Sequence, residues 1–390
     1  MANILTINGG SSSIRFAVFA SGDPPQRLLQ GKIERVGSAK ADLIVAGGEA
    51  AGTFKVRAND SRSAIASLAD WLNQHAVQPH AIGHRVVHGL DRMTPERVSA
   101  SVLNALKRLK PYDPEHLPRE IELIEALARQ YRKAPSVVCY DTAFHRDMPE
   151  VARLLPIPRR YLRRGIRRYG FHGLSYTYLM ETLKNLGDPA AADGRVILAH
   201  LGSGASMAAV RAGRCIDTSM GFTPAAGFMM STRSGDLDPG VMGYLARRER
   251  LSSARLQRLV NHESGLLGVS GISGDVRDLM ACEAKDFRAE QALELFCYQV
   301  RKWLGAFTAT LGGLDTLVFA GGIGENAAPI RGRICQGLDF LGIELDSECN
   351  ARHAPVISRS GAGVCVRVIP TDEEVVIART TQEVLQLNRK

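Results

Sequence analysis

The sequence lacks the features that mark several large classes of protein. No run of about 18 apolar residues occurs, so no segment is expected to cross a membrane. The first residues, from Met1 to Thr6, show no basic stretch followed by an apolar one, so no secretory signal is expected. The 7 cysteines are scattered and form no Cys-x-x-Cys pair, which argues against a disulfide framework and a zinc site. These absences predict a cytoplasmic protein with reduced thiols.

Several catalytic motifs are missing as well. The chain has no Gly-x-x-x-x-Gly-Lys-Ser/Thr segment, and the His-Arg-Asp and Asp-Phe-Gly motifs of protein kinases do not occur together. A Gly-x-Ser-x-Gly nucleophile elbow is also absent. The sequence therefore predicts neither a P-loop enzyme, nor a protein-kinase fold, nor an α/β-hydrolase.

The charge balance is basic. The chain carries a net charge of +9, and its pI is about 9.3. Its densest arginine cluster, residues 159–168, has only two tyrosines beside it, whereas nucleic-acid surfaces interleave more aromatic side chains with their charge. We interpret the basic balance as suited to a small anionic substrate, with no nucleic acid or membrane partner expected.

The length of 390 residues favours at least two domains. Two segments, 3–19 and 195–210, repeat the order strand, Gly/Ser-rich turn, strand. Their turns, 9–13 and 201–204, offer consecutive backbone N–H groups that can bind phosphate. The repetition, about 190 residues apart, predicts an internally duplicated α/β protein.

Polar residues stand at the ends of apolar strands. Arg85 lies within the predicted strand 81–89, and a buried arginine needs an anionic partner. Asp141 follows the apolar strand 136–140, at the carboxyl end where open α/β sheets place their ligands. It is therefore a candidate metal ligand, and Glu373, before the last predicted helix, is another.

Three further segments are predicted to be functional loops. Residues 217–240 are rich in Ser, Thr, Gly and Pro and should form a structured loop that presents Arg233 to an anion. His172 lies between glycines, in a second loop. Residues 321–327 form a Gly-rich loop after the strand 316–320, and its spacing fits a nucleotide site or, less well, a dinucleotide fingerprint. Glycine-rich turns, carboxylates and fixed positive charge are what phosphoryl transfer requires.

The chain resembles the acetate kinase family, within the acetate and sugar kinase/Hsc70/actin superfamily. The resemblance covers almost the whole length. The segments that carry it are Asn8 with 11–13, Gly83-His84-Arg85-Val86-Val87-His88-Gly89, Asp141-Thr142-Ala143-Phe144-His145, 168–173, 200–202, 217–239, 264–271, Gly321-Gly322-Ile323-Gly324-Glu325-Asn326 and 371–379.

The resemblance implies a fold and an activity. The expected fold is a duplicated actin-like ATPase (ribonuclease H-like) α/β fold, with two domains around a nucleotide cleft. The N-terminal domain would span 1–145, with a C-terminal helix of about 376–390 packing back on it, and the C-terminal domain would span 146–375. The implied activity is reversible, ATP- and Mg²⁺-dependent phosphorylation of acetate to acetyl phosphate, or of propionate or another short carboxylate. A cytoplasmic homodimer is implied.

The resemblance also assigns roles to residues. The implied catalytic residues are Arg85, Asp141, His172 and Arg233. The implied substrate-binding residues are Arg85, Val87, Phe171 and Pro224, of which the last three would line the pocket for the acyl chain. Asn8, Asp141 and Glu373 would organise Mg²⁺. The implied nucleotide-binding residues are Ser11, Ser13, Arg15, His200, Gly202, Ser203, Gly204, Asp275, Arg277, Gly322, Ile323, Gly324 and Asn326.

Some positions depart from the family pattern. The family usually has Lys where this chain has Arg15, Asn where it has Ser203, and His where it has Tyr176. It has Leu where this chain has Tyr112, and His where this chain has Asp113. A tyrosine at 112 would narrow the acyl pocket, and a carboxylate at 113 would disfavour a nearby anion. Two other readings stay open: a non-catalytic nucleotide- or acyl-phosphate-binding regulator on the same fold, and a dinucleotide-dependent enzyme.

Overall fold

The computed structural model describes residues 2–10, 13–48 and 50–387. The chain divides into two compact units: the first comprises Met1–Phe144 and Asp372–Lys390, and the second comprises His145–Thr371. Ser11, one of the expected nucleotide contacts, lies outside the described residues. Within the described part of the chain, no helix combines the length and the apolar character needed to cross a membrane.

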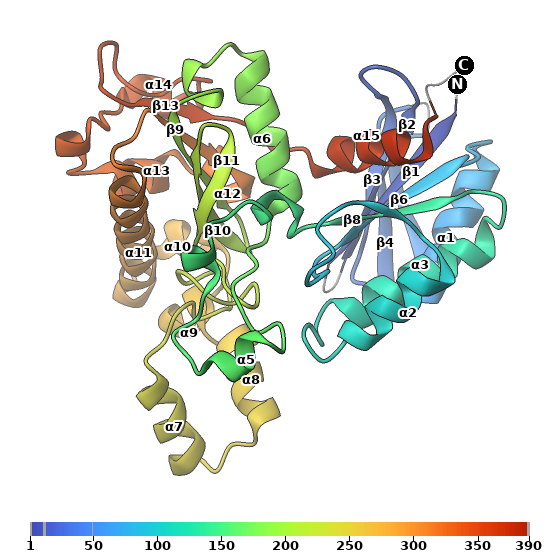
Figure 1. Ribbon diagram of the computed structural model, residues 1–390, viewed down its shortest axis with the longest axis horizontal. Coiled ribbons are helices and arrows are strands. Elements are labelled where there is room, and N and C mark those ends of the chain that lie inside the picture. Colours follow the sequence, from blue (N-terminus) through green and yellow to red (C-terminus); the bar gives the residue numbers. More distant parts are fainter. Residues whose placement is uncertain (1, 11–12, 49, 388–390) are drawn as a thin grey trace. The chain divides into compact units, whose positions relative to one another are not determined.

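The first unit is built on a mixed eight-stranded sheet with the order β5-β4-β3-β2-β1-β6-β8-β7. Strands β1 to β5 pair antiparallel in succession, and β1, β6 and β8 run parallel (Figure 1). The strands are β1 (Asn3–Gly9), β2 (Ser13–Ala20), β3 (Gln26–Glu34), β4 (Ser38–Ala46), β5 (Gly52–Ala58), β6 (Ala81–Val86), β7 (Glu96–Arg97) and β8 (Ser136–Tyr140).

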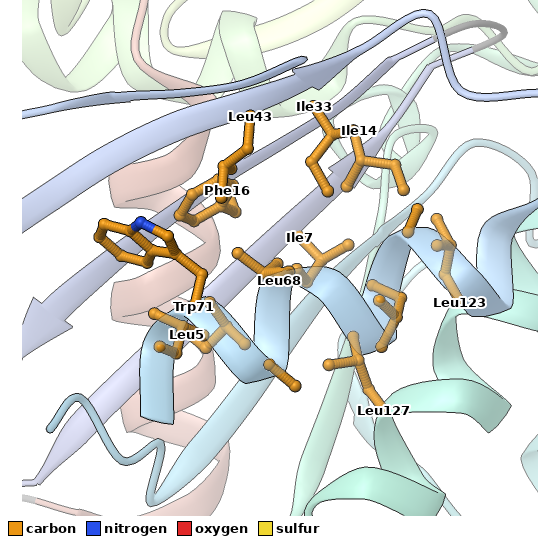
Figure 2. Packing of buried hydrophobic residues seen from close by; sticks show 14 of the residues in the cluster. Leu5, Ile7, Ile14, Phe16, Ile33, Leu43, Leu68, Trp71, Leu123 and Leu127 are labelled. Carbon is orange, nitrogen blue, oxygen red and sulfur yellow. The ribbon is translucent and has the colours of Figure 1, made fainter. Parts of the chain in front are cut away.

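Helices α1 (Ser61–Gln74) and α3 (Leu117–Gln130) cover one face of this sheet, with α2 (Ala100–Leu109) beside α3. Helix α1 begins with a capping box, in which the Asp60 side chain accepts from the Ser63 N–H and the Ser63 hydroxyl bonds back to Asp60. Its buried side contributes Leu68 and Trp71 to a cluster with Phe16 of β2 (Figure 2). Burial of a leucine or phenylalanine of this kind stabilises the fold by about 1.5–3 kcal/mol.

The last helix, α15 (Glu373–Leu385), covers the opposite face of the same sheet. It packs with Ile4 and Phe19, which alternate along their strands with the residues that face α1. The approach is close, because a Cβ atom on Gly83 would lie 2.3 Å from the Thr381 hydroxyl oxygen. A glycine is required there for the helix to sit against β6, and this places Glu373 at one edge of the sheet.

The second unit contains a five-stranded sheet with the order β11-β10-β9-β12-β13. Strands β9, β10 and β11 pair antiparallel, whereas β9, β12 and β13 run parallel. The strands are β9 (Arg195–Leu201), β10 (Ala205–Arg211), β11 (Arg214–Thr218), β12 (Thr316–Ala320) and β13 (Cys365–Val368).

Helices surround this second sheet, and α6 and the long α11 both pack against β9 (Figure 1). The second unit's α-helices are α4 (Glu150–Arg153), α5 (Arg159–Leu162), α6 (Gly173–Asn185), α7 (Pro239–Arg248), α8 (Ser253–His262), α9 (Gly265–Ser270), α10 (Val276–Cys282), α11 (Phe287–Leu311), α12 (Gly321–Asn326), α13 (Ala328–Cys335) and α14 (Ser347–Ala351).

The two sheets share one topology. The order β3-β2-β1-β6-β8 in the first unit matches β11-β10-β9-β12-β13 in the second, with the same parallel and antiparallel neighbours. The prediction of a duplicated fold from two Gly/Ser hairpins is therefore confirmed. In both units, the carboxyl ends of the parallel strands meet at one edge, which is where ligands of open α/β sheets bind.

Candidate active site

In the first unit, four predicted site residues meet at the carboxyl edge of the sheet. Asn8 ends β1, Arg85 lies near the end of β6, Asp141 follows β8 and Glu373 begins α15. Because β1, β6 and β8 are parallel neighbours, their ends lie side by side. Arg85 Nη2 donates to Asp141 Oδ2 at 2.8 Å, and Asn8 Nδ2 donates to Glu373 Oε2 at 2.7 Å.

Arg85 is the centre of this network. Its Nη1 lies 3.4 Å from Asn8 Oδ1, and its Nε lies 3.9 Å from Glu373 Oε2. The Arg85 side chain is 14% exposed and the Asp141 side chain is not exposed at all. Burial by itself would lower the pKa of Arg85, but the negative charges of Asp141 and Glu373 outweigh it and raise that pKa. The expectation that Arg85 needs an anionic partner is confirmed.

Glu120 of α3 is a part of this region that the sequence reasoning missed. Both of its carboxyl oxygens lie 3.1 Å from the backbone N–H of Val87, the expected pocket residue two positions after Arg85. Glu120 is buried, and burial raises its pKa to about 8. A signal was available, because Glu120 interrupts the apolar face that Leu117 and Ile121 define on the same helix.

In the second unit, the two predicted catalytic groups converge on the Gly/Ser turn. A Cβ atom on Gly204 would lie 3.4 Å from Arg233 Nη1 and 3.5 Å from His172 Nε2. His172 is the N-cap of α6 and adopts the left-handed conformation, with φ 60°. Such a backbone is uncommon for a residue with a side chain and is found preferentially at functional positions.

Residues 219–238, between β11 and α7, form no regular helix or strand. The loop predicted for 217–240 is therefore confirmed except at its ends, where 217–218 belong to β11 and 239–240 to α7. The loop is nevertheless fixed by hydrogen bonds. Arg233 Nη1 donates to the Pro224 carbonyl oxygen at 3.0 Å, and the Ser231 N–H donates to the Ser203 carbonyl oxygen at 3.2 Å. The loop therefore holds its arginine against the turn 201–204.

The predicted nucleotide segments of the second unit also lie together. A Cβ atom on Gly202 would be 3.8 Å from His200 Nε2 and 3.9 Å from the Gly322 backbone nitrogen. The prediction of a loop at 321–327 is wrong, because 321–326 form the short helix α12. Its first turn includes Gly322, Ile323 and Gly324, and first-turn N–H groups have no acceptor within their own helix.

Two polar side chains, Glu325 and Arg331, fix α12 at both ends. Glu325 Oε1 accepts from the N–H groups of Gly321 and Thr371, at 2.9 and 3.1 Å. Arg331 is fully buried and donates to the carbonyl oxygens of Gly324 and Glu325, and burial lowers its pKa to about 10. Neither residue was singled out from the sequence as a support for the nucleotide segment.

Other predicted nucleotide contacts occupy definite positions in the fold. Asp275 caps α10 and pairs with the exposed Arg277, and Arg15 lies opposite Asn8 on β2. Ser13 accepts from the Gly10 N–H at 2.8 Å within the first hairpin. Among the described residues, no group of three or more His, Cys, Asp or Glu side chains is arranged to hold a metal ion.

A family model described as the acetokinase family matches residues 3–379. The chain belongs to the acetokinase family. The resemblance drawn from the motifs is confirmed, and so is the two-domain, actin-like α/β fold expected of an acetokinase.

Acetokinase relatives match along nearly the whole chain. A propionate kinase from Citrobacter rodentium is 43% identical, with 98% of this chain and 96% of that protein covered. An acetate kinase from Rhodopseudomonas palustris is 42% identical, with 96% of each covered. Among solved structures, the Porphyromonas gingivalis acetate kinase is 33% identical with a TM-score of 0.89 and covers 99% of this chain and 100% of its own. A Francisella tularensis propionate kinase is 35% identical with a TM-score of 0.92 and covers 98% and 100%.

One departure from the acetokinase pattern, at residue 113, has a local structural explanation. Asp113 is buried, and its Oδ1 accepts from the His116 backbone N–H at 3.2 Å and from the ring Nδ1 at 2.8 Å. Burial would raise the pKa of Asp113, but the His116 hydrogen bond outweighs it and lowers that pKa. The carboxylate therefore serves to fix the start of α3, next to Glu120.

Proposed function

We propose that this acetokinase family member transfers the γ-phosphoryl group of ATP to the carboxylate of acetate, reversibly, giving acetyl phosphate and ADP. Propionate or another short carboxylate is the alternative acceptor. The observation that best supports the proposal is the convergence of Arg233 and His172 Nε2 on Gly204. Transfer between two anions requires fixed donors around the phosphoryl group, and one such donor contributes about 10²–10³-fold to the rate.

Each unit supplies part of the proposed machinery. Arg85 and Arg233 bind the carboxylate and the transferring phosphoryl group, and His172 donates to that group in the transition state. The residues proposed to contact the acyl chain are Val87 of the first unit and Phe171 and Pro224 of the second. Phe171 is buried, and its carbonyl oxygen accepts from His145 Nε2 at 3.0 Å, which fixes the segment before His172.

The nucleotide is proposed to bind at the glycine-rich segments of the second unit, with further contacts from the first hairpin. The proximity of Gly202 and Gly322 supports this assignment. The proposed nucleotide contacts are Ser11, Ser13, Arg15, His200, Gly202, Ser203, Gly204, Asp275, Arg277, Gly322, Ile323, Gly324 and Asn326.

Mg²⁺ is the proposed metal, and the donor set fits it. Asn8, Asp141 and Glu373 supply one amide and two carboxylate groups, and oxygen is the ligand that Mg²⁺ prefers. Arg85 and Asn8 already engage Asp141 Oδ2 and Glu373 Oε2, so the three residues suit an ion that keeps part of its water shell. The ion would neutralise charge on the phosphates.

A cytoplasmic homodimer is proposed as the form of the enzyme. Helix α7 contains no buried residue, and its Val241 and Tyr244 side chains are exposed. Leu237, just before α7, is exposed as well, and exposed apolar side chains of this kind are what self-association covers. Light scattering coupled to size-exclusion chromatography tests the assembly, and a monomeric mass at micromolar concentration would contradict it.

The activity is tested by trapping the acyl phosphate with hydroxylamine. Purified protein is incubated with ATP, Mg²⁺ and acetate, propionate or butyrate, and hydroxamate is measured, with EDTA as the control. We expect hydroxamate with at least one acid and none with EDTA. Nucleotide binding without any hydroxamate would instead favour a regulator on this fold, and binding of NAD would favour a dinucleotide enzyme. A comparison of kcat/KM among the three acids then identifies the acceptor.

A further inference from the structure

Two chains of hydroxyl groups end on a pair of stacked histidines in the second unit. The rings of His172 and His200 stack with centroids 4.3 Å apart and an angle of 26° between their planes. Nδ1 of His172 lies 2.8 Å from the Ser206 hydroxyl, and Nδ1 of His200 lies 2.8 Å from the Ser175 hydroxyl. Each ring is thus held through Nδ1 by a buried serine.

Each serine is in turn held by a second hydroxyl group. The Ser206 hydroxyl lies 2.5 Å from the Tyr176 hydroxyl, and the Ser175 hydroxyl lies 2.7 Å from the Thr371 hydroxyl. Tyr176 is fully buried, lies one helical turn after His172 on α6, and packs its ring against the edge of His145. Tyr176, Ser206 and His172 therefore form one hydrogen-bond relay, in that order.

The number of protons limits what this relay can do. The Ser206 hydroxyl has one proton for two neighbours, so it can donate to His172 or to Tyr176 but not to both. A phenol is a stronger acid than a serine hydroxyl, so Tyr176 is the better donor of the two. When Tyr176 donates to Ser206, the Ser206 proton is free to be donated to Nδ1 of His172, and in that arrangement the neutral ring carries its proton on Nε2.

The outward nitrogens of both rings face the glycine-rich turn. His172 Nε2 lies beside Gly204, and His200 Nε2 lies beside Gly202. Two stacked imidazolium rings would repel each other at this spacing, so the stack disfavours protonation of both rings at once. A neutral ring with its proton on Nε2 presents a hydrogen-bond donor, rather than an acceptor, to a phosphate oxygen.

We propose that Tyr176 is a positioning residue, which acts through Ser206 to hold His172 as a neutral ring with its proton on Nε2, ready to donate to the phosphoryl group. The catalytic part of this inference rests on the proposed function, whereas the protonation pattern does not. Tyr176 thereby has a role at a position where the family usually has histidine.

The protonation pattern is tested by nitrogen NMR on protein with ¹⁵N-labelled histidine, and His172 is assigned from the signal missing in His172→Asn. We expect the wild-type His172 to show an unprotonated Nδ1 and a protonated Nε2. In Ser206→Ala the two shifts should move toward the average of a mixed tautomer population, and Tyr176→Phe should move them less. A wild-type proton on Nδ1, or unchanged shifts in Ser206→Ala, would overturn the inference.

Kinetics test whether Tyr176 acts through Ser206. Tyr176→Phe keeps the ring and its contact with His145, and should lower kcat about five- to tenfold, the effect of one lost hydrogen bond, with the KM for the carboxylate little changed. The double variant Tyr176→Phe/Ser206→Ala should be no slower than Ser206→Ala alone. Tyr178→Phe, on the same helix, is the matched control and should keep the wild-type kcat.

The outcomes separate this inference from the proposed function. If the rate losses of the two single variants multiply in the double variant, the relay is wrong even when the enzyme is an acetate kinase. If no short carboxylate is phosphorylated by the wild type, the proposed function fails, but the nitrogen shifts still decide the protonation pattern. Melting temperatures of all variants show whether a rate loss reflects unfolding.

Discussion

The two units hold their proposed catalytic side chains in different ways. In the first unit, Arg85 is fixed by carboxylates, Asp141 at 2.8 Å and Glu373 at 3.9 Å. In the second unit, Arg233 donates to a backbone carbonyl oxygen and His172 is held by a serine hydroxyl. A charge buried against opposite charges cannot be removed without leaving the partner unpaired. The contrast therefore predicts that catalysis and stability are coupled in the first unit and separable in the second.

The largest effect is expected from Arg85→Ala. The change removes the proposed substrate-binding charge and leaves the buried Asp141 without its guanidinium partner. We expect kcat/KM to fall by about 10³-fold or more and the free energy of unfolding to fall by about 3–5 kcal/mol. Denaturant titration and the hydroxamate assay measure the two losses.

A double variant is the control for Arg85→Ala. Arg85→Ala/Asp141→Asn replaces the stranded carboxylate by a neutral amide, so it should recover part of the stability but none of the activity. An Arg85→Ala protein as stable as the wild type would show that the ion pair is not what holds this edge of the sheet.

Arg233→Ala is expected to separate activity from stability. It should lower kcat by about 10²–10³-fold because a fixed donor to the phosphoryl group is lost. The free energy of unfolding should change by only about 1 kcal/mol, since the side chain donates to the Pro224 carbonyl oxygen rather than to a buried carboxylate. A stability loss as large as that of Arg85→Ala would remove the contrast between the two units.

His172→Asn tests whether the unusual backbone at this residue matters. Asparagine tolerates the left-handed conformation that His172 adopts, so the variant should fold normally while kcat falls about 10²-fold. His172→Val is the matched comparison. A β-branched residue is strained at φ 60°, and this variant should lose a further 1–2 kcal/mol, roughly, of stability. Equal melting temperatures for the two variants would contradict this account.

The same contrast explains which site residues the sequence could identify. Arg85 and Asp141 were found because a charge inside or directly after an apolar strand is exceptional, and strand ends are where sites form. Arg233 was found because its loop has no periodicity yet is too apolar for a linker. In these cases the local pattern carried the information.

The supporting residues could not be found in this way. Ser206 sits within an apolar strand and Ser175 within a helix, and their importance comes only from partners at least 25 positions away in the chain. The sequence predicts a loop where α12 forms because glycine is a poor helix former. Glu325 and Arg331 outweigh that propensity, and distant partners hold both of them: Glu325 accepts from the Thr371 N–H, and Arg331 donates to Asn350. Long-range packing, which no local pattern encodes, decided both.

The smallest effect on activity is expected from Glu120→Gln. Glu120 is held in a third way, as a buried carboxyl group whose folded-state pKa is raised to about 8. The contribution of Glu120 to stability is complete below its unfolded pKa, near 4.5, and is lost as the pH rises to about 8. Between these pKa values the group ionises in the unfolded protein but keeps its proton in the folded protein, so rising pH favours the unfolded state. Glutamine cannot ionise and can still accept from the Val87 N–H. The melting temperature of the variant relative to the wild type should therefore rise steadily between pH 5 and pH 8, roughly the window between the two pKa values. A difference that is constant over that range would show that Glu120 is ionised in the folded protein, and would place it with the carboxylates that pair with Arg85.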